Sequence, residues 1–151
     1  MKIDFLKKSL LFCSIIGFQL FSYATDFYWI NGGGEWNNSS HWSYTSGGTS
    51  AGQVPSSEDV VHFDQNSFSS SNQYITFHED ISIHGLITNH NRNFYLTSES
   101  ANLTITGNVD ISARMEFISN GSLIFSNSSE SFGHIETGNI EFQTNLTFDG
   151  N

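Results

Sequence analysis

The feature of the sequence that most limits its fold is a short alternation of apolar and polar residues that returns along the chain. Each run has one apolar face, as in a β-strand whose successive side chains point to opposite sides. No stretch of the chain shows the i, i+3, i+4, i+7 apolar spacing of a surface helix. The sequence therefore predicts an all-β protein. The expected strands are 61–63, 75–77, 81–83, 103–105, 109–111, 115–117, 123–125, 140–142 and 146–148.

The expected strands align in columns, which indicates a repeat. Successive members of the two best columns lie 20 to 25 residues apart. The first column holds Phe94, Met115 and Ile140, the second holds Leu103, Leu123 and Leu146, and a weaker third holds Ile83, Val109 and Ile135. Short strands that recur at this period predict a β-solenoid, specifically a right-handed parallel β-helix. An antiparallel β-sandwich is the alternative, because Asn120-Gly121 and Asp149-Gly150 are pairs that favour hairpins.

The first 24 residues have the layout of a secretory signal peptide. Lys2, Lys7 and Lys8 precede an apolar run over residues 10–21, and small residues stand three and one positions before a cut after Ala24. The apolar run is shorter than the ~20 residues that span a bilayer. We therefore expect a secreted or cell-surface protein with no membrane span after cleavage.

Charge narrows the class of partner. Cleavage after Ala24 would leave Arg92 and Arg114 against fourteen carboxylates, a formal net charge of 2 − 14 = −12. Nucleic acid is therefore an unfavourable partner, because its binding depends on Lys and Arg. Cell-surface glycans, other proteins and divalent cations remain as partners. Cys13 lies within the leader, so no disulfide is expected in the exported domain.

An aromatic and glycine-rich block follows the leader and contains every tryptophan of the chain, Trp29, Trp36 and Trp42. Buried, these rings would form a cap over the first coil of the solenoid, whose open end needs protection. Exposed, they would form a platform for sugar rings. The expected organisation is a signal peptide over 1–24, a cap block over 25–68 and solenoid coils over 69–151, truncated at the C-terminus.

The block also carries a resemblance to a known group of proteins. Trp29, the Gly32-Gly33-Gly34 run, Trp36, His41-Trp42-Ser43, Pro55, Asp59, Val60, Phe63 and Asp64 resemble a segment of large secreted surface proteins of Bacteroidetes-type bacteria. A looser version opens some autotransporter passenger domains. In both settings the segment precedes β-helical repeats in adhesin-like or uncharacterised proteins. The resemblance covers about residues 28 to 68 and implies no catalytic residues.

Histidines and carboxylates are the candidate metal ligands. His78, Glu79, Asp80 and His84 could supply nitrogen and oxygen atoms to Zn²⁺. No His-Glu-x-x-His motif is present, however, and His84 should lie on the outer face of its strand, so scattered surface histidines are the preferred interpretation. No cofactor is expected, with Ca²⁺ bridging between stacked Glu116 and Glu141 as an alternative.

Catalysis depends on two basic residues. A polysaccharide lyase on this fold would need a cation near the scissile bond, and Arg92 and Arg114 are the only arginines. The prediction is an adhesin-like or structural β-helix without catalytic activity. A polysaccharide lyase, a glycoside hydrolase or a glycan-binding module is the alternative.

Overall fold

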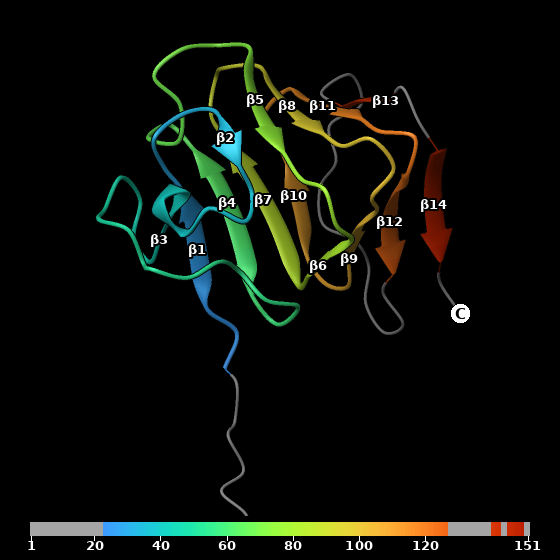
Figure 1. Ribbon diagram of the computed structural model, residues 1–151, viewed down its shortest axis with the longest axis horizontal. Coiled ribbons are helices and arrows are strands. Elements are labelled where there is room, and N and C mark those ends of the chain that lie inside the picture. Colours follow the sequence, from blue (N-terminus) through green and yellow to red (C-terminus); the bar gives the residue numbers. More distant parts are fainter. Residues whose placement is uncertain (1–22, 127–139, 143–144, 150–151) are drawn as a thin grey trace, which may run out of the picture.

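The protein is a parallel β-helix of stacked coils with three sheets along its length (Figure 1). The computed structural model describes residues 23–126, 140–142 and 145–149. Within these residues the one helical segment is η2, a single 3₁₀ turn over Ser39–His41. Parallel pairing in all three sheets excludes the antiparallel sandwich and confirms the β-helix.

The strands of each sheet come from successive coils. Sheet A has the order β10 (Val109–Ile111), β7 (Gly85–Asn89), β4 (Val60–Asp64), β1 (Asp26–Trp29) and β3 (Trp42–Ser43). Sheet B has the order β13 (Ile140–Phe142), β11 (Met115–Ile118), β8 (Phe94–Thr97), β5 (Gln73–Thr76) and β2 (Gly34–Glu35). Sheet C has the order β14 (Asn145–Asp149), β12 (Ser122–Ser126), β9 (Leu103–Ile105) and β6 (Ile81–Ile83).

The two main sequence columns match the register of the sheets. Met115 lies opposite Phe94 on one side and Ile140 on the other. Leu123 lies between Leu103 and Leu146 in the same way. Among the described side chains the inward positions of these columns are fully buried, and each such burial contributes roughly 1.5 to 3 kcal/mol.

The third column was wrong at its first member. Ile83 pairs with Ile105 in sheet C, whereas Val109 pairs with Leu86 in sheet A. The chain changes sheets at His84, between the end of β6 and the start of β7. The period-2 alternation changes phase at this corner, from Ile83 to Leu86, but the column alignment grouped Ile83 with Val109 and missed the change. Ile135 lies outside the described residues.

The repeat begins inside the segment that the sequence assigned to the cap. β1 pairs in parallel with β4, and β4 pairs in parallel with β7, so Phe27, Val61 and Leu86 form one inward column. β3 then pairs antiparallel with β1 and covers the N-terminal edge of sheet A. Figure 1 shows β1, β3 and η2 together at this end of the coils.

Candidate functional site

The tryptophans are core residues and do not form a platform. Trp29 and Trp42 are fully buried and Trp36 keeps 4% of its surface exposed. Their rings meet in edge-on contacts, with centroids 4.9 Å apart for Trp29 and Trp42 and 4.7 Å for Trp36 and Trp42. Phe63 from β4 packs against the same cluster. A sugar platform built from these three rings is therefore ruled out.

The candidate metal ligands take separate roles. His78 Nε2 lies 3.2 Å from Glu35 Oε2. Asp80 accepts hydrogen bonds from the backbone N–H and the side-chain amide of Asn102, and these donors lower the pKa of Asp80. His84 is exposed, as the sequence predicted. Within the described part of the chain, no three His, Cys, Asp or Glu residues gather in a way that could hold a metal ion.

The two arginines lie on adjacent coils and are one residue out of register with each other. Arg114 precedes Met115 by one position and Arg92 precedes Phe94 by two, while Phe94 and Met115 are in register. The guanidinium of Arg92 donates a hydrogen bond of 3.3 Å to the carbonyl of Gln65. Glu116 and Glu141 occupy paired positions of β11 and β13, as the column predicted.

The outer face of sheet B carries an aromatic pair that the sequence reasoning missed. Tyr74 on β5 lies opposite Tyr95 on β8, and their rings stack with centroids 4.5 Å apart and planes 17° apart. The Tyr95 hydroxyl donates a hydrogen bond to Asn72 Oδ1, and this bond holds the Tyr95 ring in place. Tyr74 is 54% exposed. The repeat in the sequence already indicated this pair. Tyr95 occupies the outward position next to Phe94 of the first column, and Tyr74 lies one repeat earlier.

Polar side chains continue from the tyrosine pair along β5 and two residues past its end. Tyr74, Thr76 and His78 alternate with buried Ile75 and Phe77, so the first three point outward over about 13 Å. We call the outward residues Tyr74, Thr76 and His78, with their neighbours Tyr95, Thr97 and Glu35, the β5 strip. In it the hydroxyl oxygens of Thr76 and Thr97 lie 3.2 Å apart.

A hollow of about 380 Å³ adjoins the far end of the β5 strip. Its apolar wall includes Trp36, Val54 and Phe77, and its rim includes His78 and Asp80. Val54 is 37% exposed there. The strip therefore has an aromatic end, a hydroxylated middle and an end that opens on a partly apolar hollow.

The residues of the neighbouring coil beside Tyr74 are glycines, which carry no side chain. Gly34 pairs with Ile75, which places Gly33 beside Tyr74. A Cβ on Gly33 would stand 2.9 Å from the Tyr74 carbonyl oxygen, closer than real Cβ contacts allow. The Gly33 N–H donates a hydrogen bond of 3.0 Å to the side-chain oxygen of Gln73. Gly33 thus adds no side chain beside the Tyr74 ring, whose other face rests on Tyr95.

No protein-family model, no curated protein and no solved structure matches the chain. Among the described residues, no helix has the length and apolar character needed to cross a membrane. Any function must therefore be argued from the site itself.

Proposed function

We propose that the protein is a secreted or surface-displayed, non-catalytic β-helix of the adhesin-like kind, and that its β5 strip binds glycans. The observation that carries the proposal is the Tyr74–Tyr95 stack, which keeps a large aromatic ring exposed on the outer face of sheet B. Exposed aromatic rings of this size commonly serve binding, because burying them in a monomer would be favourable.

The chemistry of the strip suits a neutral sugar. The apolar face of a pyranose carries weakly positive C–H groups, which are attracted to the negative face of an aromatic ring. The hydroxyls of Thr76 on β5 and Thr97 on β8 can donate hydrogen bonds to sugar hydroxyls or accept them. A neutral glycan also avoids the repulsion that an anionic ligand would meet on the exported chain, whose formal net charge is 2 − 14 = −12.

Surface placement is supported by the leader and by the aromatic block. The signal-peptide layout over 1–24 directs a chain to export. The resemblance of residues 28 to 68 to the opening segment of surface β-helical proteins supports display outside the cell.

The test is binding of the purified protein to an array of neutral and acidic glycans, with Tyr74→Ala as the test variant. Tyr44→Ala is the matched control, since Tyr44 is 47% exposed and packs on Phe27 of sheet A, whereas Tyr74 lies on sheet B. We expect Tyr74→Ala to weaken binding of the best glycan about tenfold and Tyr44→Ala to leave it unchanged. Equal losses in both variants, or no bound glycan at all, would sink the glycan assignment.

Product analysis with the same glycans separates binding from catalysis. A non-catalytic protein leaves each polysaccharide at its original length. Shortened products that vanish in Arg92→Ala or Arg114→Ala would replace the adhesin proposal with a polysaccharide-cleaving enzyme.

A further inference from the structure

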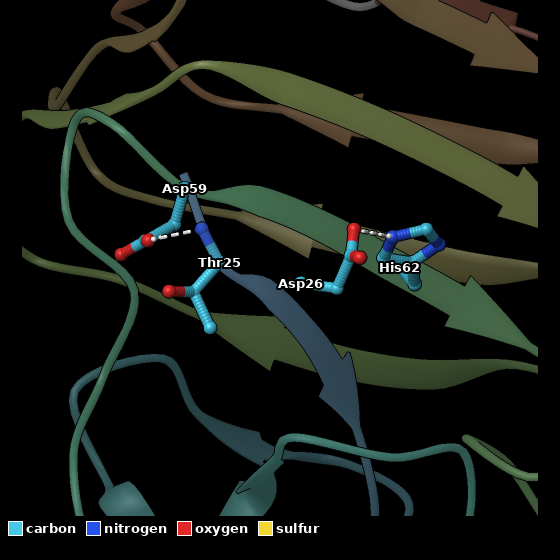
Figure 2. A network of polar contacts seen from close by, with 4 residues as sticks. All are labelled: Thr25, Asp26, Asp59 and His62. Carbon is cyan, nitrogen blue, oxygen red and sulfur yellow. Dashed lines mark hydrogen bonds and ion pairs between the residues drawn. The ribbon is translucent and has the colours of Figure 1, made fainter. Parts of the chain in front are cut away.

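The carboxylate of Asp59 is buried where the first two coils begin. Asp59 is 6% exposed and precedes β4. Its Oδ1 accepts a hydrogen bond of 3.0 Å from the backbone nitrogen of Thr25 (Figure 2). Its Oδ2 accepts two bonds of 2.7 Å from the backbone N–H and hydroxyl of Ser56. Among the described residues, these donors to the Asp59 side chain are all neutral groups.

Among the described residues, the first strand begins directly after Thr25. β1 starts at Asp26, and the Val60 N–H donates a hydrogen bond of 3.0 Å to the Thr25 carbonyl. The two residues before Thr25 are exposed, with Tyr23 81% exposed. The sequence predicts a leader cut after Ala24, and among the described residues Thr25 is the first that is hydrogen-bonded to a neighbouring coil.

We propose that removal of the leader creates an ion pair between the new α-ammonium group of Thr25 and the Asp59 carboxylate, which locks the first coil onto the second. A signal peptidase hydrolyses the Ala24–Thr25 peptide bond with one water molecule. The hydroxyl of the water goes to the Ala24 carbonyl carbon, a hydrogen goes to the Thr25 nitrogen, and the amine takes a further proton from solvent. The nitrogen already lies within hydrogen-bond distance of Asp59 Oδ1, so the fold need not move.

The surroundings favour the positive charge. Asp26 on β1 lies beside Thr25, but its Oδ1 is paired with His62 Nε2 of β4 at 2.7 Å (Figure 2). Glu58 on the preceding loop is exposed, and the His84 backbone N–H bonds the Asp59 carbonyl rather than its carboxylate. Asp59 is thus the carboxylate in hydrogen-bond contact with the Thr25 nitrogen. The other carboxylates nearby are those of Glu58 on the loop and of Asp26, which is bonded to His62.

The cleaved chain offers a selective chemical test. Lys2, Lys7 and Lys8 are the only lysines of the sequence and leave with the leader, so the Thr25 nitrogen becomes the only amine. Acetylation of that amine removes the positive charge and leaves one neutral N–H donor on an amide nitrogen, as in the uncleaved chain. The inference rests on the export proposed above, and N-terminal sequencing of the exported protein tests that premise separately from glycan binding.

We expect the exported protein to begin at Thr25. Acetylation should raise its unfolding equilibrium constant in urea about tenfold near pH 7. In Asp59→Asn, acetylation should change the constant less than twofold, and in the control Asp26→Asn it should have the wild-type effect. Because an anionic partner raises the pKa of an amine, the advantage of the free amine should be present at neutral pH and lost as the pH rises through that pKa.

Three results would overturn the inference. The first is an exported protein that begins at another residue. The second is an acetylation effect that is absent, or as large in Asp59→Asn as in the wild type. Should Asp59→Asn not fold, the pH series decides: a difference between free and acetylated protein that persists unchanged at high pH excludes an ion pair.

Discussion

The indole Nε1 of Trp42 donates a buried hydrogen bond of 2.7 Å to the backbone carbonyl of Trp36. This bond ties β3, which covers the edge of sheet A, to the chain that follows β2 of sheet B. Trp42 is fully buried and contacts the rings of Trp29, Trp36 and Phe63. The N-terminal end of the solenoid is therefore closed by a packed aromatic cluster with a specific polar contact.

Replacement of Trp42 should reveal both parts of this arrangement. Trp42→Phe keeps most of the apolar volume but removes the donor, so we expect a loss of about 1 to 3 kcal/mol in the free energy of unfolding. Trp42→Ala should cost about 3 to 5 kcal/mol, because it also leaves a cavity. Urea unfolding followed by circular dichroism measures both. The exposed Tyr44→Phe is the control, and a similar loss there would contradict the assigned role of the cluster.

The stacked columns predict opposite sensitivities for neighbours on one strand. Leu123 faces inward between β9 and β14, whereas Ile124 faces outward on the same strand and is half-buried. Leu123→Ala should lower the free energy of unfolding by about 2 to 5 kcal/mol, and Ile124→Ala by less than about 1 kcal/mol. Thermal and urea unfolding of the two variants compare aliphatic truncations at adjacent positions. Equal losses would argue against the inward orientation of Leu123.

Asn102 bridges three coils through its side chain and backbone. Its backbone N–H and side-chain amide donate to Asp80, and its Oδ1 accepts a hydrogen bond of 2.8 Å from the Ser122 N–H. The pKa of Asp80 lies below the ordinary 3.8 because of the Asn102 donors, with the backbone donor the larger cause. In Asn102→Ala the side-chain donor is lost, so the pKa of Asp80 should rise part of the way back. Carboxyl titration by NMR measures it, and an unchanged pKa would show that the backbone donor acts alone.

His90 predicts a loss of stability in acid. Burial lowers its pKa from 6.5 to about 4, with a contribution from positive Arg92 and a smaller opposing one from Asp64. The unfolded chain therefore binds a proton near pH 6.5 while the folded chain resists it until about pH 4. The stabilising contribution of neutral His90 should be complete above pH 6.5 and should fall as the pH drops from 6.5 toward 4.

A matched variant isolates this effect. His90 Nδ1 accepts a hydrogen bond of 3.1 Å from the Arg92 N–H, and Asn can supply an equivalent acceptor two residues upstream without titrating. His90→Asn should show a shallower decline in thermal midpoint between pH 6.5 and 4.5 than the wild type. His84→Asn, at an exposed histidine, should keep the wild-type slope. A parallel decline in all three proteins would remove His90 as the cause.

Much of the fold could be predicted because the repeat appears as a local alternation of apolar and polar residues. The columns through Met115 and Leu123 follow from period-2 patterning at a fixed spacing, and parallel stacking aligns equivalent side chains. The corner at His84 was missed, because the change of phase between Ile83 and Leu86 marks a break but does not say which sheet the next strand joins. The backbone bonds from His84 and Gly85 to the Asp59 carbonyl, which hold this corner, join residues far apart in sequence.

The candidate site shows the same division. Residue order and composition suffice to show which residues are apolar, how often they recur and how acidic the chain is. The burial of Trp29 and Trp42 and the exposure of Tyr74 became visible in the folded chain, because burial depends on which coil lies above each ring. The folded chain also brings Thr25 to Asp59, a contact across 34 positions that no local pattern encodes.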